Sequence, residues 1–168
     1  NIARLGIART FQIVRILPTL SVLENVAAGG VFGYDRRWGA SLEEHSRHML
    51  SRVGLENAEH APVDSLTYID QKRLELARAL VSDPRILLLD EWLAGLNPTE
   101  LLTGIDLIKE LRSDGRTIIV VEHVIDAIRS LCDRCVVMNS GVKIAEGIPS
   151  DVLKDEGVIA AYLGEEDA

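Results

Sequence analysis

The sequence predicts an α/β domain with a mostly parallel sheet, flanking helices, a separate helical segment and a C-terminal hairpin. Two short runs, 86–89 and 117–121, are almost wholly apolar, as strands buried inside a parallel sheet are. Helical patterns precede, separate and follow these runs, and such alternation is typical of a parallel sheet. Hydrophobic residues make up 47% of the 168 residues, which is enough to bury a core.

Composition and charge exclude several classes of function. The chain contains 26 Asp and Glu residues against 18 Lys and Arg residues, for a formal charge of -8. Such a surface repels phosphate backbones, so we expect no nucleic-acid partner. No apolar run approaches the roughly 20 residues that cross a bilayer, and no basic-then-apolar leader is present. With only two cysteines in addition, a cytoplasmic protein is expected.

Helical signals dominate up to about residue 65. Ser21 with Glu24, and Ser41 with Glu44, both fit the capping box, in which a hydroxyl and a carboxylate satisfy free amides at a helix start. We therefore expect one helix after Ser21 and a second from Ser41 to a stop at Gly54. The glycine-rich stretches 29–33 and 35–39 between them are expected to be a loop.

From residue 65 onward, helix and strand alternate. A helix is expected over 67–82, with an apolar stripe that contains Leu74, Ala77 and Val81. Its charged residues are expected to lie mostly off that stripe: Lys72, Arg73, Glu75 and Arg78.

The remaining elements follow from caps, apolar runs and turn residues. Asn97 and Pro98 begin a helix that is expected to stop at Asp114 and Gly115. Further elements are expected as buried strands over 86–89 and 117–121, a helix over 124–131, a hairpin that turns at 139–141, and a helical tail over 150–163.

Acidic residues and a histidine follow the two apolar strands, at the edge where parallel α/β proteins bind ligands. Asp90 and Glu91 follow the first strand, and Glu122 and His123 follow the second. Adjacent carboxylates at the end of a buried strand are costly to desolvate without a cation. One is therefore a candidate Mg²⁺ ligand and the other a candidate for activating water. The alternatives are two solvated acids that cap a strand end and a histidine that is structural or exposed.

Several segments, in this order, resemble the motifs of ATP-binding-cassette (ABC) ATPases. They are Gly6–Gln12, like the Q-loop region; Leu66–Leu80, like the signature motif and its helix; and then Leu87–Glu91, Ala94–Pro98 and Val121–His123. The closing stretch from Ser130 to Gly164 resembles the subgroup that serves branched-chain amino acid importers. The likeness spans essentially the whole chain and implies a partial P-loop NTPase fold.

The resemblance implies a role for each matching residue, with ATP and Mg²⁺ as cofactors. Asp90 would hold the metal, and Glu91 would be the general base. Gln12 would touch the metal or the attacking water, and His123 would contact the γ-phosphate. Residues of the signature motif and of the loop after Glu91 would face the nucleotide of a partner cassette: Thr67, Ile69, Asp70, Gln71 and Asn97.

The resemblance also implies three regions and two kinds of partner. Residues 1–16 would be the Q-loop region, 17–64 a helical subdomain that docks on membrane subunits, and 65–168 the rest of the ATPase core with the hairpin and final helices. A second cassette, identical or different, would complete the nucleotide site. The chain would lie peripherally on the inner face of the cell membrane and hydrolyse ATP to power branched-chain amino acid import.

Some features depart from the family pattern. No G-x-x-x-x-G-K-[ST] sequence occurs, so we expect a C-terminal portion of a cassette that is inactive by itself. Ile69 stands where the family usually has glycine, and its branched side chain is expected to keep a phosphate away. Trp92 replaces a proline and is expected to change how Glu91 faces the nucleotide. Asp70 either adds charge near an anion site or favours the first helical turn. The alternative function is therefore a catalytically impaired cassette that acts as an interaction module for the membrane subunit.

Overall fold

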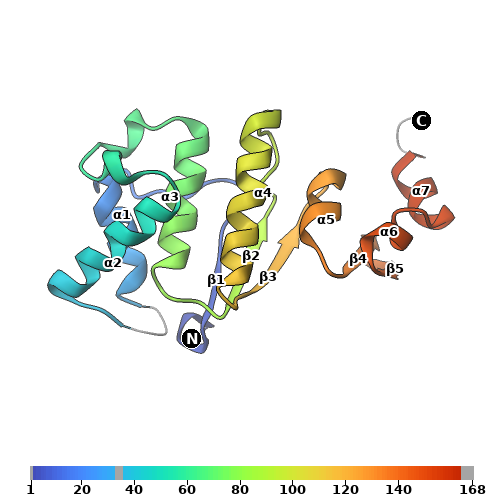
Figure 1. The fold of residues 1–168 in the computed structure, drawn as a ribbon, viewed down its shortest axis with the longest axis horizontal. Helices are drawn as coiled ribbons and strands as arrows, with labels where there is room; N and C mark the ends of the chain where they lie inside the picture. The colour runs from blue at the N-terminus through green and yellow to red at the C-terminus, as the bar shows by residue number, and fades with distance from the viewer. Residues whose placement is uncertain (1, 33–35, 164–168) are drawn as a thin grey trace. The chain divides into compact units, whose positions relative to one another are not determined.

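The computed structural model describes residues 2–32 and 36–163, which form two compact units. The first unit extends to Val121 and contains the parallel sheet and the large helices, coloured from blue to the light orange of its last strand in Figure 1. The second begins at Glu122 and contains a hairpin and short helices, coloured orange to red. The finer regions expected at 1–16, 17–64 and 65–168 stay predictions.

The first unit is built on a three-stranded sheet in the order β1-β2-β3, and both strand pairs are parallel. The strands are β1 (Ile7–Arg9), β2 (Ile86–Asp90) and β3 (Thr117–Val121). Helix α3 (Tyr68–Leu80) precedes β2, and α4 (Pro98–Ser113) connects β2 to β3. The predicted alternation is confirmed, and the carboxyl ends of the strands share one edge of the sheet.

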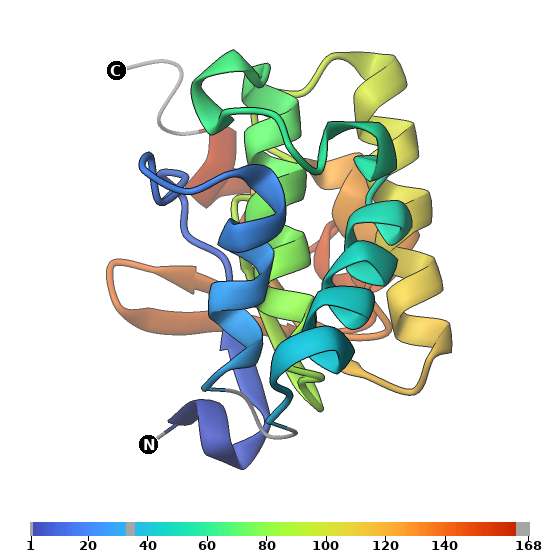
Figure 2. The same ribbon diagram turned by 90° about the vertical axis from the view of Figure 1, so that its left-hand side faces the viewer.

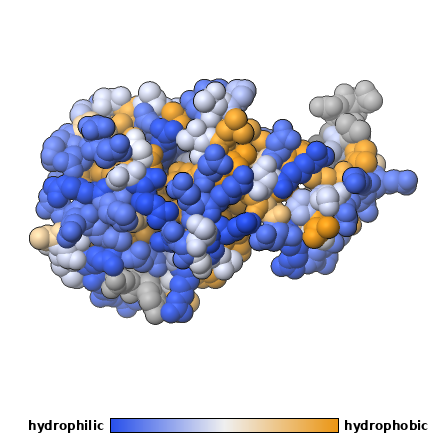
Figure 3. Space-filling view, in the orientation of Figure 1, coloured by the Kyte–Doolittle hydropathy of each residue, from blue (hydrophilic) through white to orange (hydrophobic). Residues whose placement is uncertain are grey.

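The first unit contains further helices outside this strand–helix alternation. They are α1 (Val22–Gly30), α2 (Gly39–Arg52) and the 3-10 helices η1 (Ile2–Leu5), η2 (Glu56–Ala58) and η3 (Val63–Ser65). Helices α1 and α2 contact each other and α3, and Figure 2 shows the three side by side. At Gly29, a Cβ atom would lie 2.2 Å from the carbonyl oxygen of Arg78, so only glycine permits this approach of α1 to α3. Figure 3 shows mostly hydrophilic side chains over α1 and α2 in this view.

Two of the predicted helix starts are confirmed and one is wrong. Ser21 and Glu24 form the predicted capping box before α1, and Asn97 caps α4 as expected. Ser41 caps nothing, because α2 begins two residues earlier at Gly39, whose φ of 57° turns the chain into the helix. Gly54 follows the helix end as predicted. The predicted loop is shorter than expected, since α1 extends to residue 30, and residues 33–35 lie outside the described residues.

Burial of the sheet is one-sided, which contradicts the predicted double-sided burial. In β2, Leu87 and Leu89 are buried, whereas Leu88 is half-exposed. In β3, Ile119 and Val121 are 51% and 60% exposed. Because Leu88 is paired with Ile119 in the parallel register, these two side chains share the open face. Packing within the first unit therefore covers only one face of the sheet.

The charge pattern of α3 also differs from the prediction. Leu74, Ala77 and Val81 lie in the core as expected. However, Lys72 and Glu75 are only 3% and 2% exposed, so two of the four charged residues point inward. An unpaired buried charge is very costly, and both side chains therefore require polar partners.

The second unit is a hairpin flanked by helices. Strands β4 (Cys135–Asn139) and β5 (Val142–Gly147) are antiparallel, and the predicted turn is confirmed by positive φ angles at Ser140 and Gly141. The helices are α5 (Ile125–Leu131), α6 (Pro149–Val152) and α7 (Glu156–Leu163). The predicted single helical tail is thus two helices, interrupted between 152 and 156. Within the described parts of the chain, no helix has the length and hydrophobicity required to cross a membrane.

An ionic contact connects α2 to the turn between α4 and β3. Arg52 Nη1 donates to Asp114 Oδ2 at 2.8 Å, and Arg116 contacts the same oxygen. The hydrogen bond from Arg52 is the largest cause that holds the pKa of Asp114 below its ordinary value of 3.8. This carboxylate therefore stabilises the folded state only in its charged form.

We predict unequal effects for the two serines that share the capping-box pattern. Ser21→Ala removes the oxygen that accepts the N–H of Glu24 at 3.3 Å, and it is expected to lower the free energy of unfolding by about 1 kcal/mol. Ser41→Ala, inside α2, is expected to change that energy by less than about 0.5 kcal/mol. Urea denaturation of both variants measures the difference. An equal loss at Ser41 would mean that α2 starts there in solution.

Asp114→Asn is expected to lower the free energy of unfolding by about 0.5 kcal/mol at pH 7, because the side chain is partly exposed and its ion pairs are screened. The folded-state pKa lies below 3.8. The contribution of Asp114 is therefore complete at pH values well above 3.8, the ordinary pKa, and is lost as the pH falls through the folded-state pKa. Denaturation at pH 7 and pH 3 should show the gap between variant and wild type shrink. Asp106→Asn, at a side chain 74% exposed, is the control.

Candidate functional site

Three of the predicted site residues meet at the carboxyl edge of the sheet. Gln12 follows β1, and Asp90 and Glu91 follow each other at the end of β2. The side-chain amide Nε2 of Gln12 donates to Glu91 Oε2 at 2.8 Å. Arg9 Nη2 lies 3.2 Å from Asp90 Oδ2 in an ion pair. The predicted proximity of a glutamine to the carboxylates at this edge is confirmed by the bond between Gln12 and Glu91. The sequence pattern carried no indication of Arg9.

Thr10 aligns the ends of β1 and β2 and was also missed by sequence reasoning. It is fully buried, and its backbone N–H donates to the carbonyl of Leu88 at 2.9 Å. Its hydroxyl oxygen accepts the N–H of Asp90 at 3.4 Å. The one available signal was a hydroxyl residue directly after a strand, two residues before Gln12. Thr10 thereby fixes the position of the Asp90 backbone relative to the end of β1, which Gln12 follows.

Glu91 has a strained backbone. Its φ of 47° lies in the left-handed region, which costs a residue with a side chain about 1–2 kcal/mol. Its N–H donates to the carbonyl of Val121 at 2.8 Å, and its own carbonyl accepts from Lys72 Nζ at 3.4 Å. Backbone strain held by neighbouring contacts is typical of functional positions. Here it turns the Glu91 side chain toward Gln12.

Trp92 is buried and bonded to α3, while its expected effect on how Glu91 faces the nucleotide stays a prediction. Its indole is 2% exposed, and Nε1 donates to the carbonyl of Lys72 at 3.1 Å. In return, Lys72 Nζ donates to the carbonyls of Trp92 at 3.0 Å and Ala94 at 2.7 Å. The ammonium group of Lys72 also lies 5.1 Å from the ring centre of Tyr68. These contacts satisfy the buried charge and attach the loop after β2 to α3.

Side chains at the start of α3 bond to one another and to the backbone of the first turn. Thr67 Oγ1 accepts the N–H of Asp70 at 3.3 Å and lies 2.7 Å from Asp70 Oδ2. Asp70 also pairs with Arg73 at 3.2 Å, and Gln71 Nε2 donates to the carbonyl of Leu66 at 3.2 Å. Of the two interpretations of Asp70, these contacts support the one in which it stabilises the first helical turn.

The other predicted site residues occupy separate positions. Ile69 is partly buried in the first turn of α3. Asn97 Oδ1 accepts the N–H of Glu100 at 3.0 Å as the cap of α4. His123 belongs to the second unit. Contact of Thr67, Ile69, Asp70, Gln71, Asn97 and His123 with nucleotide stays a prediction.

The donors at the sheet edge fit Mg²⁺ bound together with phosphate. Asp90 and Gln12 offer a carboxylate and an amide oxygen, which are the hard ligands that Mg²⁺ prefers. In residues 2–32 and 36–163, no group of three His, Cys, Asp or Glu side chains is placed to hold a metal. A protein-only cage is therefore not built here. That agrees with Mg²⁺, which usually takes one or two carboxylates and completes its shell with water and substrate phosphate.

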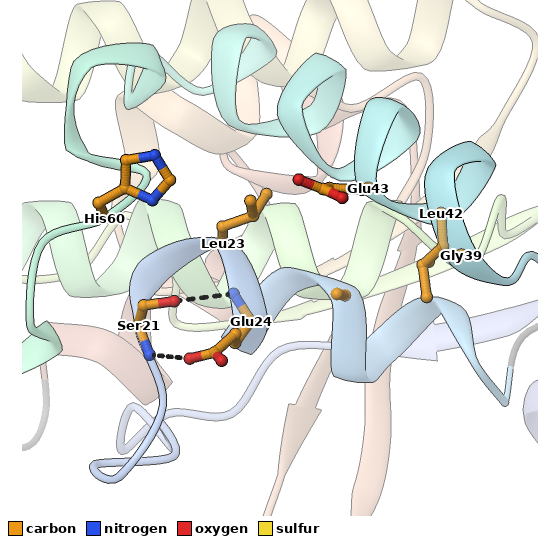
Figure 4. A pocket seen from close by; sticks show the side chains of 8 residues that line it. Ser21, Leu23, Glu24, Gly39, Leu42, Glu43 and His60 are labelled. Carbon is orange, nitrogen blue, oxygen red and sulfur yellow. Dashed lines mark hydrogen bonds between the residues drawn. The ribbon is translucent and has the colours of Figure 1, made fainter.

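A pocket of about 460 Å³ lies apart from this edge, between α1 and the start of α2. Figure 4 shows its lining, with the capping box of Ser21 and Glu24 at one end and His60 beside it. The backbone N–H of Ser21 is the largest cause that lowers the pKa of Glu24. The pocket shares no lining residue with the sheet edge.

Fold and site together define an α/β protein whose polar side chains gather at the carboxyl edge of a parallel sheet, where ligands bind in this class. A family described as "ABC transporter" matches residues 1–94, and one described as "Branched-chain amino acid ATP-binding cassette transporter" matches residues 142–168. The chain is 38% identical to the high-affinity branched-chain amino acid transport ATP-binding protein LivG of Escherichia coli strain K12, over 98% of this chain and 70% of LivG. BraF of Pseudomonas aeruginosa, with the same description, is 37% identical over the same shares.

Solved structures agree. The ADP conformation of the ATP-binding cassette MJ1267 superposes with a TM-score of 0.84 at 28% identity, over 97% of this chain and 70% of that one. A dimeric post-hydrolysis structure of the cassette MJ0796, bound to ADP and Pi, gives 0.79 at 28% identity, over 88% of this chain and 65% of that one. The chain belongs to the family of ABC transporter ATP-binding proteins. Members of this family bind ATP with Mg²⁺ and work as paired cassettes with membrane subunits.

We predict that Lys72→Met lowers the free energy of unfolding by about 2 kcal/mol, because three backbone carbonyls lose a charged donor in a buried place. Methionine keeps most of the volume, so the loss reports the hydrogen bonds. Lys109→Met is the matched control on α4, where the lysine is about half exposed. Chemical denaturation measures both. Equal, small effects would show that the contacts of Lys72 add no stability.

Proposed function

We propose that this chain is an ATP-hydrolysing subunit, or a portion of one, of an ABC importer for branched-chain amino acids. The observation that carries the proposal is the 2.8 Å hydrogen bond between Gln12 and Glu91 at the sheet edge. It joins the two residues that, by resemblance, manage the attacking water. The likeness to LivG and BraF, which are named for branched-chain amino acid transport, supports the substrate class.

The site residues divide the chemistry of phosphoryl transfer. Glu91 is the general base that polarises water, and its strained backbone sets the direction of the carboxylate. Asp90 and Gln12 would hold Mg²⁺, which would neutralise charge on the phosphates. By resemblance, His123 would contact the γ-phosphate. The ion pair with Arg9 occupies one oxygen of Asp90 and keeps that side chain oriented at the edge.

Two cassettes complete the site. In the proposal, Thr67, Ile69, Asp70, Gln71 and Asn97 face the nucleotide bound to the partner cassette, where the N-terminus of α3 offers amides and a favourable dipole. The helical region 17–64 docks on the membrane subunits and holds the chain on the inner face of the cell membrane. The phosphate cradle and its lysine come from a P-loop, which the 168 residues do not contain.

A second candidate function is an interaction module without turnover. The observation that favours it is Ile69 at the start of α3, since a β-branched side chain there obstructs the close approach of a phosphate. In this alternative the helical region still binds the membrane subunit.

The test joins the chain to the P-loop portion of LivG from E. coli and measures ATP hydrolysis in vesicles that contain the membrane subunits. We expect hydrolysis that depends on Mg²⁺ and on the membrane subunits. Glu91→Gln should reduce it by at least about a hundredfold, whereas Glu110→Gln, at an exposed site on α4, should leave it unchanged.

Ile69→Gly separates the two candidates. If the chimera binds the membrane subunits but hydrolyses ATP only after this substitution, the interaction module is correct. Hydrolysis that survives Glu91→Gln would contradict the role of Glu91.

A further inference from the structure

The segment that follows β1 is held by a buried carboxylate of α3. Glu75 is 2% exposed, and its two oxygens accept two different backbone N–H groups. Oε2 accepts from Phe11 at 3.2 Å, and Oε1 accepts from Arg15 at 3.0 Å. These two amides stand on either side of Gln12. One side chain therefore fixes the backbone before and after the glutamine.

Arg78, one turn further along α3, completes this arrangement. Its guanidinium lies 3.6 Å from Glu75 Oε1 and also donates to the carbonyl of Arg15. Both backbone polar groups of Arg15 are thus bound by α3. The segment from 11 to 15 forms neither helix nor strand, so these side-chain contacts take the place of a backbone ladder.

The aromatic ring of Phe11 adds a third restraint. The guanidinium groups of Arg9 and Arg15 each lie 4.6 Å from its centre. Such cation–π contacts contribute roughly 0.5–1 kcal/mol each at exposed sites. They connect the end of β1 to the far end of the segment, while the side chain of Gln12 stays exposed and reaches Glu91.

Burying the carboxylate of Glu75 costs desolvation energy, and packing alone gives no reason for a charged residue at this position. Desolvation is the largest influence on this carboxyl and raises its pKa, against the backbone N–H bonds and the two arginines, Arg78 and Arg15, which lower it. Buried ionic groups are often replaceable by apolar residues without loss of stability. What Glu75 adds over such a residue is the placement of two amides.

We propose that Glu75 is a positioning residue for the Q-loop glutamine: it clamps the backbone on both sides of Gln12 and so keeps the Gln12 side chain against Glu91. This inference rests on the proposed function for its meaning in catalysis. The two hydrogen bonds of Glu75 couple α3 rigidly to the backbone around Gln12. A displacement of the helix that faces the partner cassette is then transmitted to Gln12 without passing through the sheet.

The test is NMR on the chain itself, without nucleotide. In Glu75→Gln, we expect the amides of Phe11 and Arg15 to exchange with solvent at least about tenfold faster, because charged acceptors are lost. The amide of Thr10, bonded to Leu88, should change less than about twofold. The side-chain amide signal of Gln12 should shift as its bond to Glu91 weakens. Glu44→Gln, at an exposed site on α2, is the control.

A titration of the unmodified chain keeps the test decisive if Glu75→Gln does not fold. The amide proton shifts of Phe11 and Arg15 should follow one common midpoint above 4.5, the ordinary value for Glu75. Unchanged exchange in the variant, or amide shifts that do not titrate together, would overturn the proposal. Neither readout needs ATP, so an inactive chimera with an intact clamp would reject the function alone.

Discussion

The carboxyl edge of the sheet depends on one constraint, which is that α3 buries two charged side chains that must find polar partners. Lys72 and Glu75 are 3% and 2% exposed, and buried charges without partners are far too costly to persist. Lys72 takes the carbonyls of the loop after β2, and Glu75 takes the N–H groups on either side of Gln12. Neither loop can leave without exposing its charge to an apolar surrounding. The same hydrogen bonds therefore stabilise α3 and hold the two loops of the site in place.

The backbone of Glu91 depends on the same set of contacts. A left-handed conformation at a glutamate persists only when neighbouring contacts hold it, and here Val121 and Lys72 supply them. The meeting of Gln12 with Glu91 could be predicted from sequence, because the carboxyl ends of parallel strands share an edge. The strain could not. Residue type carries no signal for a positive φ at glutamate, and the hydroxyl of Thr10 is recognisable as an aligner only after the strands are paired.

Local signals predicted the fold best. The capping box at Ser21 holds because its two partners are three residues apart and need no tertiary context. The same pattern at Ser41 fails because Gly39 starts the helix first. Apolar runs located the strands, but which face is covered depends on where helices pack, so the exposure of Ile119 was not foreseen. Periodicity also treats charge as solvent-seeking. It therefore predicted that Lys72 and Glu75 face solvent, whereas both side chains point inward and bind the loops of the site.

Two of the departures from the family pattern, Trp92 and Ile69, differ in what surrounds the side chain. Trp92 is compensated within the chain, since its indole is buried under the loop and bonded to the helix that carries Lys72. A proline cannot donate such a bond, so the tryptophan adds a contact between α3 and the site. In the proposed function, the glycine that Ile69 replaces would allow a phosphate on another cassette to approach. No contact within the chain would restore that space. The contacts of Trp92 therefore lie inside the fold, whereas the proposed effect of Ile69 lies at an interface between two cassettes.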